Sequence, residues 1–339
     1  MKAVRFHQHG RADVLRYEDA PEPERRAGDV IVRVRACALN HLDLWNRRGV
    51  VRLPLPHISG ADVAGEVVDS SDKELPAGRR VMVQPGLSCG RCQACLEGHD
   101  NECARYDVLG SQSDGGYAEF VRVPAHNIVP IPDAIGFVEA AAFPLTFVTA
   151  WHMLVTRAGI RPGEDVLVIG AGSGVGQAAI QIALLHGARV VATAGTEEKL
   201  TRAKELGACD AVNHHTQDVP AEIRRLTSNR GVDVVIEHAG EATWERSLKC
   251  LTRGGRLVTC GATTGYKAAI DLRFLFAKQH TLMGSYMGTK AELLRAAQFF
   301  FAGQLRPAVD RTFPLPEAAA AQAYLEEGKQ FGKVVLTDI

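Results

Sequence analysis

Short apolar runs separated by Gly and Pro dominate the first 132 or so residues of the chain. They carry little of the 3.6-residue periodicity of a helix, so they predict strands. The clearest runs cover residues 30–34, 64–68, 80–83 and 117–123. We expect this part of the chain to be mostly β.

The pattern changes near residue 140, where apolar runs begin to alternate with segments of helical periodicity. Such alternation predicts a parallel sheet with helices on both faces. Predicted strands cover residues 165–169, 189–192, 232–237 and 256–260, and predicted helices cover 176–186 and 197–206. Near the end of the chain we expect helices at 291–301 and around 318–321, and a closing strand at 332–337.

Length and composition add a domain count and exclude some functions. A chain of 339 residues exceeds what one hydrophobic core usually organises, so two domains are expected. With 46% hydrophobic and 23% charged residues, the chain has the composition of a globular protein. Its 39 basic and 39 acidic residues cancel, and no basic stripe interleaved with aromatic residues is present, so we expect no nucleic-acid partner.

No membrane segment or secretion signal is expected. Lys2 and Arg5 are not followed by an apolar stretch, and the uncharged window 166–185 is divided by glycines into a short strand and a helix. Eight cysteines without a signal favour a reducing compartment, so we expect a cytoplasmic protein whose thiols are ligands or buried apolar groups.

A glycine cluster at residues 170–176 lies between a predicted buried strand and a predicted helix. Backbone without side chains can approach a pyrophosphate there, at the helix N-terminus, so the turn predicts a dinucleotide site. The spacing departs from G-x-G-x-x-G, because Ala171 and Ser173 stand where glycines are expected, and a tight turn without a ligand is the alternative. The residues expected to bind are Ser173, Gly174, Val175 and Gly176.

The next strand end predicts the form of the cofactor. NAD-preferring folds carry an acidic residue about twenty residues beyond the glycine turn, but this chain has Ala194 there, followed by Gly195 and Thr196. Lys199 lies just beyond and can supply a positive charge to a 2′-phosphate. We therefore expect NADPH to be preferred over NADH; the alternative is that Lys199 is only a solvated helix residue.

Four cysteines are spaced C-x2-C-x2-C-x7-C in a glycine-containing loop. Thiolates at such short separations can hold one Zn²⁺ tetrahedrally, and four of them leave no open coordination position, so the metal is expected to be structural. Two local disulfides are the less favoured alternative. The expected ligands are Cys89, Cys92, Cys95 and Cys103, whereas Cys37, Cys209, Cys250 and Cys260 are expected to be buried apolar groups.

Together these features resemble the zinc-containing medium-chain dehydrogenase/reductase superfamily, over essentially the whole chain. The resemblance implies an α/β protein with a GroES-like, mostly β catalytic domain at 1–145, whose structural zinc lobe covers about 86–106. It implies a Rossmann domain with a doubly wound parallel sheet at 146–285, and a segment at 286–339 that completes the catalytic domain. It also implies an active site between the two domains and a homodimer, with the edge strand near residues 281–286 available for pairing.

The chain departs from the family's zinc alcohol dehydrogenases at all three positions that hold their catalytic zinc. Asn40, Ala61 and Leu145 stand at the matching places, and these side chains cannot form a three-ligand zinc site. The motifs around them instead resemble the quinone oxidoreductase branch, whose members reduce activated double bonds without a catalytic metal. Typical members of that branch lack the cysteine quartet, which this chain keeps.

Without a metal, charge that develops on a substrate oxygen needs another stabiliser, and a conjugated substrate lowers that demand. Asn40 is the expected hydrogen-bond donor, His41 an additional donor or the proton source, and Asp43 and Asp62 the groups that orient them. The alternatives are that Asn40 caps a helix starting near His41, that His41 is an ordinary half-buried residue, and that Asp62 only binds loop amides.

Further cofactor contacts are expected at the carboxyl ends of the later strands, since these ends face the ligand in an open α/β sheet. The candidates are His238, Ala239, Gly261 and Ser285, together with Thr149 of the Val-Thr-Ala-Trp stretch at 148–151. Turn formation is the alternative role of the strand-end residues.

The sequence thus predicts an NADPH-dependent enzyme that reduces a small enone or quinone and holds one structural zinc. The first alternative is a carbonyl reductase or alcohol dehydrogenase, with no catalytic metal or with an atypical site made by His41, His57 and Asp62. The second is a redox-sensing protein that binds NADPH without turnover.

Overall fold

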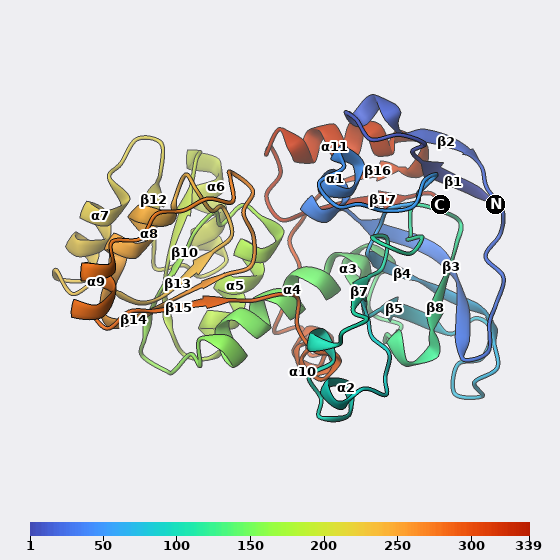
Figure 1. The fold of residues 1–339 in the computed structure, drawn as a ribbon, viewed down its shortest axis with the longest axis horizontal. Coiled ribbons are helices and arrows are strands. Elements are labelled where there is room, and N and C mark those ends of the chain that lie inside the picture. The colour runs from blue at the N-terminus through green and yellow to red at the C-terminus, as the bar shows by residue number, and fades with distance from the viewer. The chain divides into compact units, whose positions relative to one another are not determined.

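The computed structural model describes all residues, 1–339, and the chain divides into two compact units. Met1–Thr146 and Thr289–Ile339 form the first unit, and Phe147–Gly288 forms the second. The blue N-terminal strands and the red C-terminal elements lie in the same unit in Figure 1, so the end of the chain completes the fold of its beginning.

The first unit is built on a sheet in the order β16-β17-β3-β4-β5-β9, in which β8 also pairs with β3. All pairings are antiparallel except that of β16 with β17. Along β3 the side chains alternate, with Val32 and Val34 buried and Arg33 and Arg35 exposed, because successive strand residues face opposite sides. The strands are β3 (Asp29–Ala38), β4 (Asp62–Ser70), β5 (Arg80–Val83), β8 (Phe120–Pro124), β9 (Ile128–Pro130), β16 (Val309–Pro314) and β17 (Lys333–Thr337).

Two small two-stranded sheets and several helices complete this unit. The sheets pair β1 (Lys2–Arg5) with β2 (Arg16–Asp19), and β6 (Gly86–Leu87) with β7 (Asp107–Val108). The helices are α1 (His41–Arg48), α2 (Gln93–Leu96), α3 (Phe137–Ala142), α10 (Lys290–Phe301) and α11 (Ala318–Glu326). The division between the units falls within α4 (Pro144–Trp151), which a π-helical turn, His152–Arg157, continues.

The second unit contains a six-stranded parallel sheet in the order β12-β11-β10-β13-β14-β15. This order reverses direction between β10 and β13, as in the Rossmann fold. The strands are β10 (Asp165–Val168), β11 (Arg189–Ala194), β12 (Asp210–Asn213), β13 (Val232–Glu237), β14 (Leu251–Thr259) and β15 (Thr281–Gly284). The helices are α5 (Gly174–Leu185), α6 (Glu197–Glu205), α7 (Val219–Leu226), α8 (Trp244–Cys250) and α9 (Leu272–Ala277).

Three local expectations need correction. β3 continues to Ala38, well beyond the predicted end at 34, because its outward Arg33 and Arg35 interrupt the apolar run without interrupting the ladder. β14 begins at Leu251 rather than at the predicted residue 256, and it includes Gly254 and Gly255. Cys209 is exposed rather than buried, and its thiol donates to the Val190 carbonyl.

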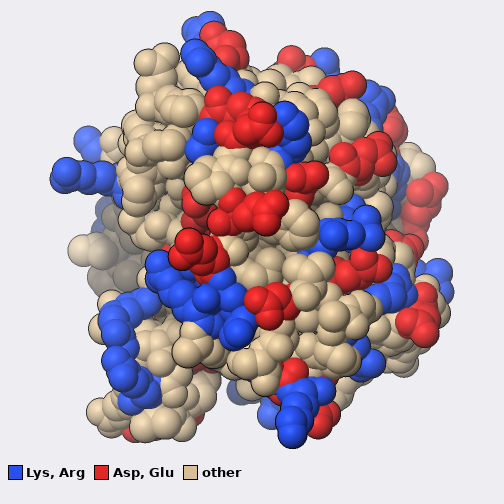
Figure 2. All heavy atoms as spheres, turned by 90° about the vertical axis from the view of Figure 1, so that its right-hand side faces the viewer, with Lys and Arg blue, Asp and Glu red and all other residues tan.

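The surface agrees with the balanced charge of the sequence. On the face of the first unit shown in Figure 2, basic and acidic side chains are interspersed. Pairs such as Arg5 with Glu18 and Arg35 with Glu66 bring opposite charges together on this unit. None of the helices combines the length and apolar character that a membrane crossing requires.

Candidate functional site

Except for Thr149 in α4 and Lys199 in α6, the predicted cofactor residues of the second unit lie at or just after the carboxyl ends of its parallel strands. The glycine turn follows β10, Gly195 and Thr196 follow β11, and His238 and Ala239 follow β13. Gly261 and Ser285 come just after β14 and β15. Because all these strands are parallel, the structure brings the residues to one edge of the sheet, where such folds bind nucleotides.

The glycine turn leads directly into α5. Ser173 is the N-cap of this helix, and its hydroxyl oxygen accepts a hydrogen bond from the backbone N–H of Gly176 at 2.8 Å. A Cβ at Gly176 would lie 2.3 Å from the Gly170 carbonyl oxygen, so only glycine fits at this position. Gly174, Val175 and Gly176 form the first turn of α5, which can therefore present backbone N–H groups to a phosphate.

His238 is tied to the same turn. Its Nε2 lies 3.0 Å from the Ser173 hydroxyl, and burial lowers the pKa of His238, so the imidazole is neutral near pH 7 and can accept the serine proton. The preceding Glu237 is fully buried and accepts hydrogen bonds from the backbone N–H groups of Ala239 and Gly240 and from the Ser247 hydroxyl. This carboxylate fixes the loop that carries His238.

The end of β11 presents no carboxylate at Ala194. The nearby Glu197 accepts a hydrogen bond from Asn213 Nδ2 at 3.0 Å, and the Thr196 hydroxyl caps α6 by accepting from the Lys199 backbone N–H. Lys199 and Arg246 both contribute positive charge near His214, and burial is the main cause that lowers the pKa of that histidine. His214, whose backbone N–H donates to the Ala194 carbonyl, thus lies at this corner near two cationic side chains.

Two predicted cofactor residues carry buried hydroxyl groups without a partner. Thr149 Oγ1 and Ser285 Oγ are both buried and make no hydrogen bond within the protein. Buried polar groups are normally satisfied, so these two call for an external partner. A nicotinamide dinucleotide offers carboxamide and ribose groups that can provide it, and the residues present fit such a cofactor.

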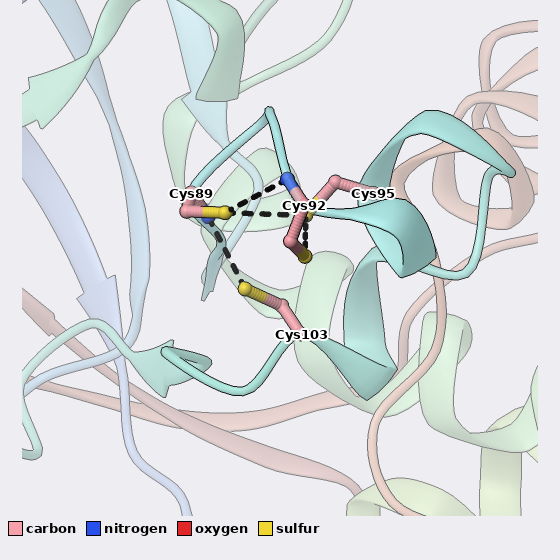
Figure 3. A group of neighbouring side chains, drawn as sticks. All are labelled: Cys89, Cys92, Cys95 and Cys103. Atoms are coloured by element: carbon pink, nitrogen blue, oxygen red, sulfur yellow. Dashed lines mark hydrogen bonds between the residues drawn. The ribbon is translucent and has the colours of Figure 1, made fainter.

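The four cysteines of the predicted zinc lobe come together in the first unit (Figure 3). Their sulfur atoms all lie within 4.8 Å of one another; Cys89 and Cys95 are 3.9 Å apart and Cys92 and Cys95 are 3.4 Å apart. Four sulfurs bound tetrahedrally to Zn²⁺ would be about 3.8 Å apart, so the cluster fits this metal closely. Backbone N–H groups of Cys89, Cys92 and Arg105 donate to cluster sulfurs, which suits thiolate ligands.

On the first unit, Asn40 and Asp62 meet a third residue that the sequence reasoning missed. Asn40 Nδ2 donates to Asp62 Oδ2 at 3.0 Å. The ammonium group of Lys333 donates to Asn40 Oδ1 at 2.6 Å and to Asp62 Oδ2 at 2.9 Å. Asp62 Oδ1 accepts from the backbone N–H of Leu145 at 2.8 Å. The side chains of Lys333 and Asp62 are 2% and 0% exposed, so this is a buried ion pair with an amide attached.

Asp43 lies beside this group and organises the start of α1. Its carboxylate accepts hydrogen bonds from the backbone N–H groups of Asn40 and Gly60 and from the Tyr117 hydroxyl. Asn40 is the N-cap of α1, which was the alternative role of this residue, and its side chain also contacts Asp62. Burial raises the pKa of Asp43 to about 6, against the hydrogen bonds, which lower it.

The two histidines of this region do not join a metal site. His41 begins α1, with its ring centroid 6.5 Å from that of Trp45. His57 is buried, its Nε2 donates to the Gly110 carbonyl at 2.9 Å, and burial lowers its pKa. The cysteine quartet is the one group of three or more His, Cys, Asp or Glu donors close enough to share a metal ion. The atypical set of His41, His57 and Asp62 is therefore not assembled.

One feature of the sequence indicates that Lys333 is buried. It is the only charged residue in the predicted closing strand at 332–337, and the residues after it, Val334, Val335 and Leu336, are apolar. A lysine in a strand that is otherwise buried implies a buried partner. The partner itself is not readable from the sequence, because it lies about 270 residues away, across the pairing of β17 with β3.

Comparisons with known proteins agree with this architecture. Residues 26–133 match the model of the alcohol dehydrogenase GroES-like domain, and residues 174–302 match that of the zinc-binding dehydrogenases. The chain is 30% identical to the quinone oxidoreductase of Homo sapiens, covering 99% of this chain and 97% of the relative. It is 32% identical to an NAD-dependent alcohol dehydrogenase of Sulfurisphaera tokodaii, with 99% of each chain covered.

A solved structure described as an NAD-dependent alcohol dehydrogenase superposes with a TM-score of 0.97, at 48% identity and with 99% of each chain covered. Both the fold class and the family expected from the motifs are thereby confirmed. The chain is an oxidoreductase that belongs to the zinc-type medium-chain dehydrogenase/reductase superfamily.

Proposed function

We propose that this enzyme reduces the activated double bond of a small enone or quinone with NADPH, without a catalytic metal. The observation that carries the proposal is the buried group formed by Asn40, Asp62 and Lys333. The oxygen atoms that a cation would need there already bind an ammonium group, and Ala61 and Leu145 offer no ligand atoms. A Lewis-acid zinc at this place would be repelled by the Lys333 ammonium group and would have too few ligand atoms.

When bound, NADPH would supply a hydride to the substrate, and with a proton from solvent an enone would become a saturated ketone and a quinone a hydroquinone. The chain's own residues would bind the cofactor and orient the groups that contact the substrate. The first turn of α5 and the hydroxyl groups of Thr149 and Ser285 would hold the cofactor. Asn40 would donate to the oxygen that gains charge, and Asp43 would fix Asn40 through its backbone N–H.

The preference for NADPH rests on the corner after β11. Ala194 offers no carboxylate to a ribose 2′-hydroxyl, and Glu197 is engaged by Asn213. The positive charges of Lys199 and Arg246 near His214 would attract a 2′-phosphate. A reverse preference, measured as a higher kcat/KM with NADH, would remove this part of the proposal.

The second candidate function is alcohol oxidation or carbonyl reduction, favoured by the 48% identical structure described as an NAD-dependent alcohol dehydrogenase. One experiment separates the two. The purified enzyme is assayed with an enone, a quinone, a simple ketone and an alcohol, and its zinc content is measured on the same sample. Enone or quinone turnover with about one zinc per chain supports the proposal; alcohol turnover with about two supports the alternative.

We also propose a homodimer formed through the second unit, in a cytoplasmic enzyme. β15 is the edge strand of its sheet, and α9, which precedes it, exposes Leu272, Phe274 and Phe276 by 65%, 57% and 72%. An exposed edge strand beside apolar side chains is a favourable surface for pairing with a second copy. Sedimentation at micromolar concentration tests this, and a monomer there would contradict it.

A further inference from the structure

The ammonium group of Lys333 has a defined position beside Asn40. Its ammonium group is almost completely buried, at 2% exposure, and lies 2.6 Å from Asn40 Oδ1. A contact this short between a charged donor and an amide oxygen is a strong, charge-assisted hydrogen bond. The same ammonium group is 2.9 Å from Asp62 Oδ2, so both of its contacts are to groups at the candidate active site.

These contacts determine which way the Asn40 amide faces. Its oxygen accepts from Lys333, and its nitrogen donates to Asp62. The reversed amide would place N–H groups against the ammonium and oxygen against the carboxylate, so it is excluded on chemical grounds. The second N–H of Asn40 has only a contact at 3.5 Å, to the Ala38 carbonyl oxygen. This is the limit for a hydrogen bond, so the second N–H is available to a better acceptor.

We propose that Lys333 is a positioning residue for the reaction: its ammonium group locks and polarises the Asn40 amide, so that the second N–H becomes a stronger donor to the substrate oxygen. This role rests on the proposed function. Hydrogen bonds arranged in series strengthen one another, and an ammonium on the amide oxygen draws electrons from the amide nitrogen. Lys333 thus supplies positive charge to the site through Asn40, without leaving its own buried position.

The expected effect on turnover depends on the substrate. Lys333→Met removes the charge and leaves Asp62 and Asp43 without a neighbouring cation. We expect kcat for a simple enone to fall about 10- to 100-fold, the range for losing a hydrogen bond to a charged group. The loss should be smaller for a benzoquinone, because its reduced anion is less basic and needs less stabilisation. KM for NADPH should stay within about threefold, since the cofactor residues are held by other contacts.

The control is Lys329→Met, which removes an exposed lysine paired with Glu327. Because Lys333→Met leaves the buried Asp62 carboxylate without its counter-charge, the double variant K333M/D62N is measured as well; it lacks both the ammonium group and the carboxylate that the ammonium neutralised. The double variant should show the same acceptor-dependent loss of kcat. An equal loss for both acceptors, or no loss in either variant, would overturn the role of Lys333.

A second readout needs no turnover. The side-chain amide protons of Asn40, assigned by their disappearance in Asn40→Ala, should move upfield in NMR spectra of K333M/D62N and stay in place in Lys329→Met. A further variant, Asp62→Asn, controls for loss of the carboxylate alone. If the wild-type enzyme reduces neither acceptor, the proposed function fails, but the NMR signal of the Asn40 amide still tests the effect of Lys333 on that amide. A shift in K333M/D62N that is no larger than the shift in Asp62→Asn would show that Lys333 does not polarise the amide.

Discussion

Removal of one partner from the buried pair of Lys333 and Asp62 is the sharpest test of the structure's energetics. Lys333→Met keeps a side chain of similar length but leaves the Asp62 carboxylate, which is 0% exposed, without its counter-charge. Breaking a buried ion pair in this way typically costs about 3–5 kcal/mol, because the remaining charge is not solvated.

The local contacts place the cost near the lower end of that range. Asp62 would keep two hydrogen bonds, from the Leu145 backbone N–H at 2.8 Å and from Asn40 Nδ2 at 3.0 Å. We therefore expect a loss of about 3 kcal/mol in the free energy of unfolding at pH 7. For a unit of about 200 residues, this lowers the unfolding temperature by about 6–12 °C.

Thermal unfolding followed by circular dichroism measures the effect, with Lys329→Met as the exposed control and K333M/D62N as the rescue. The control should change the stability by less than about 0.5 kcal/mol, because an exposed pair contributes little. The double variant should recover most of the loss, since neutral groups replace both charges. Equal unfolding temperatures for Lys333→Met and the control would refute the buried pair, and a double variant as unstable as Lys333→Met would refute the electrostatic origin of the loss.

Three further outcomes are expected. Ala194→Asp should lower the ratio of kcat/KM for NADPH to that for NADH by at least about tenfold, because a carboxylate repels the 2′-phosphate and binds the ribose hydroxyl; an unchanged ratio would place the selectivity elsewhere. Cys103→Ser should reduce the bound zinc from about one per chain to a small fraction, and metal analysis showing full occupancy would contradict the four-thiolate site. Burial raises the pKa of Asp43 to about 6, above its unfolded value near 3.9, so folding favours the protonated acid and stability should fall by about 2 kcal/mol as pH rises from 4 to 8. This decline should be absent in Asp43→Asn when unfolding is followed between pH 4 and 8.

The sequence predicts the second unit well because its signals are local. Each strand of the βαβ units is a short apolar run, and every cofactor candidate except Thr149 and Lys199 lies at or just after the end of one, so the edge of the sheet follows from chain order. The pattern predicts both ends of β13, Val232–Glu237, correctly. Cys209 shows the limit of the approach: it has an apolar neighbour, but it follows the exposed end of α6, and only the fold reveals its exposure.

The candidate active site of the first unit is harder to predict, because its parts come from distant segments. The capping position of Asn40 and its N-x-x-D spacing to Asp43 are local, and the structure brings both residues together with Asp62. Lys333 is brought next to these residues only by the antiparallel pairing of β17 with β3, in which Val335 lies opposite Ala38. The register of such a long-range pair depends on the whole sheet, so no local pattern identifies the partner of this lysine.

The Lys333 contacts also bear on which substrates the proposed reaction can accept. A metal ion can take a substrate oxygen as an additional ligand, whereas this ammonium group already donates to Asn40 and Asp62 and acts at most through hydrogen bonds. Hydride addition to a simple ketone places a full charge on one oxygen, while addition to an enone shares it between the oxygen and the α-carbon. Hydrogen bonds therefore stabilise the charge formed from an enone more adequately than the charge formed from a ketone. Because the buried ammonium group occupies the oxygen atoms that a zinc ion would need, it disfavours a catalytic zinc and so favours conjugated substrates.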